Sequence, residues 1–170
     1  RHAPSETARR ESVARALAVM REDASGASWV VAGHSMGGHL AARVARRPPE
    51  PMRALVLLAT THPRDFSLAE LDLPVVKVYG TRDGIATPEG MQRNAAMLPA
   101  TTTWIAIRGG NHSQFGYYGS QLGDCGAGVI TDSFFEDSFP NWNAGGVLPS
   151  WIEAHALSAM ISDTPRPRMR

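Results

Sequence analysis

Residues 29–47 read WVVAGHSMGGHLAARVARR, and this stretch decides the fold class. The apolar run from Trp29 to Ala32 predicts a short strand that is buried on both faces. Apolar residues then recur on one side of a predicted helix, which starts near Met36 and runs to about Arg47, where two prolines stop it. A strand that turns directly into a helix is typical of α/β proteins.

Ser35 lies at the turn between this strand and this helix, with a glycine two positions away on each side. So sharp a turn strains the backbone, and Gly33 and Gly37 remove the side chains that would collide with it. We therefore expect Ser35 to present its hydroxyl group, as a nucleophile requires. The helix N-terminus would face the same point, which makes the backbone N–H of Met36 a candidate oxyanion-hole donor. The alternative is a glycine-rich turn without chemistry.

Strands and helices alternate on both sides of this turn. A helix is predicted from Ser5 to Asp23, and another starts at the cap Thr87, with an apolar stripe that reaches Leu98. Further strands are predicted at Arg53–Ala59, Val75–Gly80 and Thr102–Ile107. Because no two-residue hairpin turn joins these strands, the sequence indicates an α/β fold with a mostly parallel sheet flanked by helices.

Two polar residues follow strands in this prediction. Asp83 comes just after the strand Val75–Gly80, and His112 follows the last strand in a glycine-rich loop. Parallel α/β sheets place catalytic groups at the carboxyl ends of their strands. An imidazole at His112 can take the proton of Ser35, and a carboxylate at Asp83 can orient that imidazole. For Asp83, a purely local role in a turn is the alternative.

The chain resembles the α/β-hydrolase superfamily at three motifs, which occur in the order serine, aspartate, histidine. These motifs are GHSMGG at 33–38, TRDGIATP at 81–88 and RGGNH at 108–112. The segment GGNHSQFGYYG is also similar to a dienelactone-hydrolase-related subgroup of small, uncapped bacterial hydrolases. The resemblance covers about Glu6 to Gly126. It implies a partial α/β-hydrolase fold without a cap domain, with Ser35, Asp83 and His112 as its catalytic triad.

The resemblance also implies a reaction. Ser35 would form an acyl-enzyme, His112 would move the protons and water would release the acid, with a small carboxylic ester, lactone or thioester as substrate. His34, Phe115 and Tyr117 are the candidate substrate-binding residues, although loop aromatics such as Tyr117 more often anchor their own loop. The alternative function is a non-catalytic binding or interaction protein that retains the hydrolase scaffold.

The other histidines and the cysteine carry weaker signals. His39 and His62 are expected to be solvated or bonded to local partners. No HxxxH, HxH or CxxC spacing occurs, so the sequence predicts no metal site, and no cofactor is implied. Cys125 is the single cysteine, which excludes an internal disulfide and makes an incidental thiol the simplest interpretation.

Composition limits the range of partners. A length of 170 residues suits one ordinary domain, and the formal net charge of +1 argues against nucleic acid or an acidic membrane as a partner. No apolar run approaches the roughly 18 residues of a membrane-spanning helix. The sequence leaves the cellular compartment open, because a targeting segment can precede the given N-terminus.

Both ends depart from the resemblance. Only one helix precedes the strand at Trp29, whereas the superfamily has several strands there, one of whose loops supplies the second oxyanion donor. We therefore expect N-terminal strands to be missing. Residues 1–130 are expected to form the C-terminal portion of a catalytic domain, and residues 131–170 a divergent tail. The connection Thr60–Pro74 is too short for a helical lid, which predicts an open pocket for small substrates.

Overall fold

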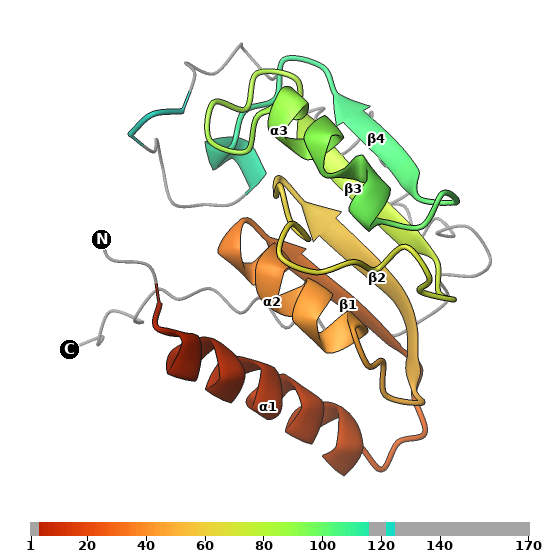
Figure 1. Cartoon of the computed structure of the whole chain (residues 1–170). Helices are drawn as coiled ribbons and strands as arrows, with labels where there is room; N and C mark the ends of the chain where they lie inside the picture. The colour runs from red at the N-terminus through yellow and green to blue at the C-terminus, as the bar shows by residue number, and fades with distance from the viewer. Residues whose placement is uncertain (1–3, 116–121, 125–170) are drawn as a thin grey trace, which may run out of the picture.

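The computed structural model describes residues 4–115 and 122–124, and a four-stranded parallel β-sheet forms its centre (Figure 1). The strands lie in sequence order, β1-β2-β3-β4, and each pairs in parallel with the next. The elements are α1 (Glu6–Glu22), β1 (Trp29–His34), α2 (Met36–Ala45), β2 (Met52–Leu58), β3 (Val75–Gly80), α3 (Pro88–Arg93), the 3₁₀ turn η1 (Ala95–Met97), β4 (Thr103–Ile107) and the 3₁₀ turn η2 (Ser113–Phe115). The predicted α/β class and parallel sheet are confirmed.

Side-chain caps start the first and third helices where the sequence predicts them. Ser5 Oγ accepts a hydrogen bond from the backbone N–H of Ala8 at 3.2 Å, at the start of α1. Thr87 Oγ1 accepts one from the backbone N–H of Gly90 at 3.1 Å, at the start of α3. Both contacts satisfy amides that have no partner within the helix.

The third helix is shorter than predicted. It ends at Arg93, and the chain continues through η1, so the stripe expected to reach Leu98 spans two short elements. Asn94 explains this end, because its side-chain amide donates to the carbonyl of Gly90 at 3.2 Å and to the carbonyl of Thr61 at 2.9 Å. The first of these carbonyls is the acceptor that a continuing α-helix would use for the amide of Asn94.

Alternate residues of the inner strands point to opposite faces of the sheet. In Figure 1, α2 and α3 lie in front of the sheet, and α1 runs beside α2 near the β1 edge. The larger core lies between the sheet and the helices and includes Met20, Ala41, Val44, Leu55, Leu57 and Val75. A smaller cluster on the other face consists of Val76, Val78 and Ile107, with Val56, Leu58, Ile105 and Phe115 packed against it.

The first strand lies at the edge of the described sheet, where β2 is its neighbour. The prediction that its apolar run is buried on both faces is wrong, because Trp29 is buried but Ala32 is exposed. A strand with one neighbour leaves its other edge uncovered, so apolar composition alone does not bury it.

The connection between β2 and β3 agrees with the prediction that it holds no helical lid. Residues 60–74 contain turns and bends, and no helix is found among them. The predicted boundary at residue 130 and the tail from 131 to 170 lie outside the described residues and stay predictions.

Close backbone contact fastens β1 to the start of α2. A Cβ atom on Gly33 would lie 2.2 Å from the carbonyl oxygen of Gly37 and 2.6 Å from the amide nitrogen of Gly38. A Cβ atom on Gly38 would lie 2.6 Å from Cγ2 of Thr60, beyond the end of β2. The turn after β1 therefore has room for glycine at these positions and not for a larger residue.

We expect Gly33→Ala to lower the free energy of unfolding by about 2–3 kcal/mol, because its Cβ would meet backbone atoms that cannot rotate away. Gly26→Ala is the matched control. A Cβ on Gly26 would meet nothing within 4 Å, so no clash is added. The left-handed φ of 71° remains unfavourable for alanine, and the substitution should lower the free energy of unfolding by about 1 kcal/mol. Urea unfolding measures both values. Equal losses in the two variants would contradict the packing argument.

Candidate active site

Ser35 has the strained backbone that its place in the sequence predicts. Its φ is 53° and its ψ is −117°, between the end of β1 and the first residue of α2. Its amide donates to the carbonyl of Leu58 at 3.0 Å, which holds the turn to the end of β2. The hydroxyl makes no capping hydrogen bond with α2, although serine is a good cap. The side chain is thus available for another partner.

His112 is that partner. Its Nε2 atom lies 2.9 Å from Ser35 Oγ, and its Nδ1 atom lies 2.9 Å from Oδ2 of Asp83. The sequence separations are 77 and 29 residues, so only the fold brings the three side chains together. The imidazole of His112 and the carboxylate of Asp83 are buried, since these residues are 1% and 2% exposed. Ser35 itself is half-buried, which leaves its oxygen within reach from outside.

Local hydrogen bonds fix the carboxylate of Asp83. Oδ1 accepts from the backbone N–H groups of Ile85 at 2.9 Å and Ala86 at 2.6 Å. Oδ2 remains for the histidine. Each oxygen therefore has its own partners, and this arrangement favours the tautomer of His112 with a proton on Nδ1 and a lone pair on Nε2. That lone pair is directed at the hydroxyl of Ser35.

The loops that carry Asp83 and His112 are fastened together just beyond their strands. Thr81 N–H donates to the carbonyl of Ile107 at 3.0 Å, and Arg82 N–H donates to the carbonyl of Gly110 at 2.8 Å. Gly80 is required there, because a Cβ on it would lie 2.2 Å from the same Gly110 oxygen. The parallel β3–β4 pairing thus continues into both loops.

Asp124 is a residue of this site that the sequence reasoning missed. Its carboxylate accepts hydrogen bonds from the backbone amides of Gly84, His112 and Ser113 and from the Ser113 hydroxyl, at 2.8–3.2 Å. Burial opposes ionisation of Asp124, but hydrogen bonds from Ser113, Gly84 and His112 outweigh it and lower its pKa. In the sequence it resembles an ordinary turn aspartate after Gly123, and no local spacing signals its distant partners.

His34 and Phe115 pack beside the candidate base. The ring of His34 lies 4.7 Å from that of His112 and stacks on Phe115 at 5.7 Å, centroid to centroid. These ring contacts bring two of the three predicted substrate-binding residues next to His112. Their predicted role in binding substrate stays a prediction. Tyr117, the third residue of that group, and Cys125 lie outside the described residues.

Met36 occupies the position expected of an oxyanion donor. It is the first residue of α2, and the backbone N–H groups in the first turn of a helix have no acceptor within that helix. The helix dipole adds positive potential at that end. The arrangement favours negative charge that develops next to Ser35.

His39 and His62 form a second histidine pair away from Ser35. Their Nδ1 atoms lie 2.8 Å apart, and both residues are buried. The expectation that each is solvated or locally bonded is wrong, because 23 residues separate them and a tertiary contact joins α2 to the loop after β2. With Asp65, they form a cluster of atoms with the chemistry of metal ligands.

Burial and the surrounding cations favour neutral rings in this histidine pair. Burial and the nearby cation of Arg43 lower the pKa of His39, while burial, His39 and Arg64 lower that of His62 to about 4. The buried ammonium of Lys77 donates to the carbonyl of His62 at 2.8 Å. A hydrogen bond between two neutral histidines, in which one Nδ1–H donates to the Nδ1 atom of the other, accounts for the 2.8 Å contact. Such a pair adds no charge to these basic surroundings.

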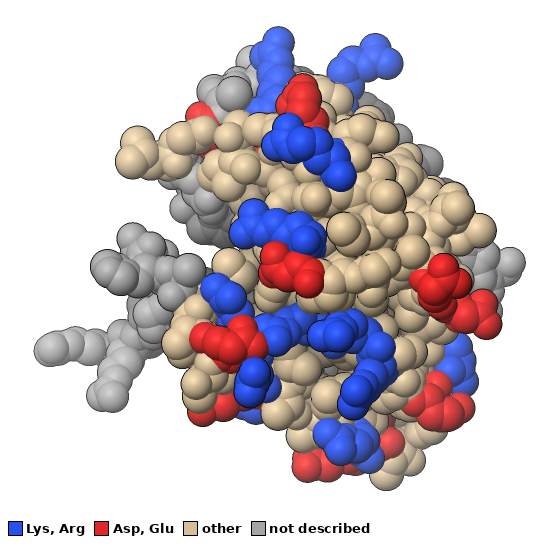
Figure 2. All heavy atoms as spheres, viewed as in Figure 1, with Lys and Arg blue, Asp and Glu red and all other residues tan. Residues whose placement is uncertain are grey.

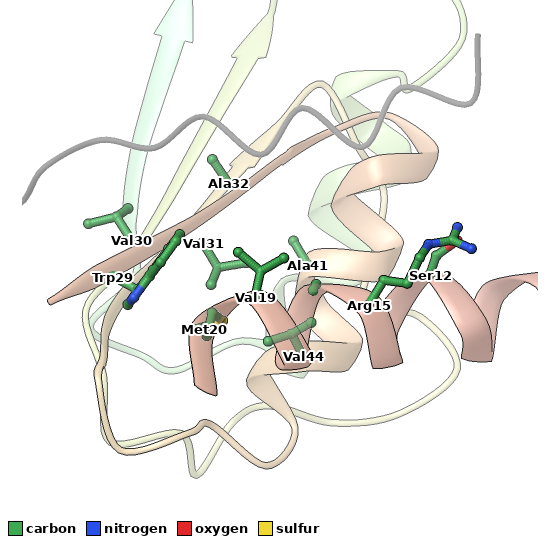
Figure 3. Close-up of a pocket in the computed structure, with 11 residues that line it drawn as sticks. Ser12, Arg15, Val19, Met20, Trp29, Val30, Val31, Ala32, Ala41 and Val44 are labelled. Carbon is green, nitrogen blue, oxygen red and sulfur yellow. The ribbon is translucent and has the colours of Figure 1, made fainter. Parts of the chain in front are cut away.

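An apolar pocket is lined by residues of α1, β1 and α2 (Figure 3). Its volume is about 190 Å³, and Val19, Met20, Trp29, Val31 and Val44 are among the side chains that surround it. None of the residues that line it belongs to the group around Ser35. The pocket is therefore separate from the hydrogen-bonded group of Ser35, His112 and Asp83.

The charged surface fits the small formal net charge. Figure 2 shows basic side chains gathered over α1 and α2, with acidic ones beside them. Glu6, for example, bonds the guanidinium of Arg43 across the two helices and that of Arg10 along α1.

In the part of the chain that the structure describes, no helix is long and apolar enough to cross a membrane.

Comparison with known proteins identifies a family. The family model described as "Alpha/beta hydrolase family" matches residues 11–135. No curated protein matches the sequence significantly. The chain spans about half to two thirds of the length of the solved structures that follow.

Three solved structures illustrate the likeness in fold. A SOBER1 variant from Arabidopsis thaliana is 20% identical with a TM-score of 0.54, over 65% of this chain and 60% of that one. A CIB-like hydrolase from Thermoplasma acidophilum is 15% identical with a TM-score of 0.52, over 62% and 51% of the two chains. A monoacylglycerol lipase from Paleococcus ferrophilus is 15% identical with a TM-score of 0.52, over 63% and 68%.

We expect the half-buried His34 and the buried His62 to make the fold sensitive to mild acid. Burial lowers the pKa of both His34 and His62 to about 4, whereas an unfolded histidine titrates near about 6.5. The unfolded chain therefore binds more protons between these values, so stability that is complete above pH 6.5 is lost as the pH falls toward 4.

Urea unfolding across this pH range measures the loss. His62→Asn should flatten the decline, because it removes one of the groups that must stay neutral in the fold. His2→Asn is the control for loss of a histidine near the chain end. A decline in His62→Asn as steep as that of the parent would contradict this account.

Proposed function

Because this chain belongs to the alpha/beta hydrolase family, we propose that it is a serine hydrolase that cleaves carboxylic ester bonds. The observation that carries the proposal is the chain of contacts from Ser35 Oγ to His112 Nε2 and from His112 Nδ1 to Asp83, each 2.9 Å long. A hydroxyl, an imidazole and a carboxylate in this order form the arrangement that activates a serine nucleophile.

In the first half-reaction, Ser35 Oγ attacks the carbonyl carbon of the ester while His112 Nε2 takes the hydroxyl proton. The tetrahedral intermediate carries its negative charge on the former carbonyl oxygen, which the Met36 N–H stabilises. The intermediate collapses when the bond to the alcohol oxygen breaks, and His112 gives its proton to that oxygen. The products of this half-reaction are the free alcohol and an acyl group on Ser35.

In the second half-reaction, water attacks the acyl carbon and His112 takes one of its protons. Collapse of the second intermediate returns that proton to Ser35 Oγ and releases the carboxylic acid. The carboxylate of Asp83 stabilises the imidazolium that forms twice in each cycle. Its burial strengthens that attraction, since water does not screen the pair.

The proposed substrates are small molecules with an acyl group. Residues 60–74 contain no helix to cover the site, which supports access for a small ester from outside. Lactones and thioesters present the same electrophilic carbonyl, so they belong to the same proposed class. We assign His34 and Phe115 to the wall of the substrate pocket because their stacked rings adjoin His112.

Hydrolysis of p-nitrophenyl acetate by the purified chain tests the proposal, with labelling by a fluorophosphonate as a second measurement. Ser35→Ala should lower kcat by about 10³-fold or more and abolish labelling, since it removes the hydroxyl that His112 contacts. Ser67→Ala, which removes an exposed serine in the loop before β3, should match the parent. Asp83→Asn should also lower kcat strongly, because an amide favours the wrong histidine tautomer.

A folded parent that is neither labelled nor faster than Ser35→Ala would overturn the proposal for this chain. The scaffold would then serve as a binding or interaction protein. Cooperative thermal melting of each variant establishes that the compared proteins are folded.

A further inference from the structure

The carboxylate of Asp124 lies between the two loops that carry Asp83 and His112. Oδ1 accepts from the amide of Gly84 and from the amide of His112, both at 3.2 Å. Oδ2 accepts from the amide and from the hydroxyl of Ser113, both at 2.8 Å. One side chain thus contacts the residue after the candidate acid, the candidate base itself and the residue after that base.

The backbone ladder between β3 and β4 leads up to this bridge. The ladder that extends β3–β4 pairing reaches the bond between Arg82 N–H and Gly110 O, and His112 lies two residues farther along the loop. Asn111 and Gln114 bond each other, at 2.9 and 3.2 Å, which closes the histidine loop on itself. Farther along this loop, the His112–Asp83 bond and the bonds of Asp124 join it to the acid turn.

The bridge uses charge on one side and backbone dipoles on the other. The hydrogen bonds from Ser113, Gly84 and His112 lower the pKa of Asp124 against the opposing effect of burial, so the group is ionised at neutral pH. An ionised acceptor makes stronger hydrogen bonds than a neutral one. Because three of the four donors are main-chain amides, these bonds act on the position of the loop backbone and not only on a rotamer.

We propose that Asp124 is a positioning residue, which sets the distance of His112 from Asp83 and Ser35 by clamping the histidine loop to the acid turn. This inference rests on the proposed hydrolase function. Asp124 neither contacts the Ser35 hydroxyl nor moves a proton in the reaction. It acts through the backbone of His112, and displacement of a catalytic group by about 1 Å can cost on the order of 10²-fold in rate.

Steady-state hydrolysis of p-nitrophenyl acetate by the full chain measures the catalytic effect. Asp124→Ala should lower kcat by about 10- to 100-fold with little change in KM, because the geometry of proton transfer changes and the substrate pocket does not. Ser113→Ala removes one contact of the clamp and should have a smaller effect in the same direction. Asp72→Ala, which removes an exposed aspartate before β3, is the matched control and should equal the parent.

NMR of ¹⁵N-histidine-labelled protein provides a readout that does not need activity. The parent should show a downfield Nδ1 proton from the His112–Asp83 bond, identified by its loss in His112→Asn. Asp124→Ala should broaden or remove that signal at a temperature where the variant is fully folded. A merely structural role would lower the melting temperature and leave this signal, and the kcat of the folded fraction, unchanged.

The outcomes separate the two proposals. If the parent is inactive, the proposed function fails, and the NMR comparison still decides whether Asp124 positions His112. If Asp124→Ala does not fold, the comparison of Ser113→Ala with the parent decides, since that change removes the hydroxyl contact with Asp124 and keeps the backbone amides. An unchanged histidine signal together with an unchanged kcat in the folded variants overturns the proposal.

Discussion

At Ser35 the backbone has a φ of 53° and a ψ of −117°, and the packing of β1 against α2 holds it there. Gly33 makes this packing possible, because a Cβ would lie 2.2 Å from the Gly37 carbonyl oxygen. The consequences reach the rest of the site. The Ser35 hydroxyl makes no capping hydrogen bond with α2, and Met36 is the first residue of that helix. Ser35 Oγ lies 2.9 Å from His112 Nε2.

Parallel pairing supplies the second half of the arrangement. Because β1, β3 and β4 run in the same direction, the loops after them leave the same edge of the sheet. The contact between Gly80 and Gly110 then brings the acid turn and the histidine loop together. Strain at Ser35 therefore belongs to one packed unit of strand and helix, whereas the place of His112 depends on contacts between loops.

The sequence predicted the elements and the three residues now joined by hydrogen bonds, because their signals are local. Ser35, Asp83 and His112 each follow an apolar strand, and the carboxyl ends of parallel strands lie at the same edge of a sheet. The pairing of His39 with His62 could not be predicted, since it spans 23 residues and no spacing encodes it. Asp124 reaches Gly84 over 40 residues, and β1 is less buried than its composition suggests because it has one neighbour in the described sheet.

The two parts of the site differ in how they tolerate change. The serine turn is built into the core, where Gly33 and Gly38 meet backbone and Thr60, so changes there act on folding and chemistry together. The histidine is held by polar contacts at the loop ends, where the carboxylate of Asp124 is only half-buried. Half-buried hydrogen bonds contribute little to global stability, yet they fix the position of an imidazole that must stay within 2.9 Å of two partners. In this fold, the stability of the core and the alignment of His112 are therefore separable properties that rest on different residues.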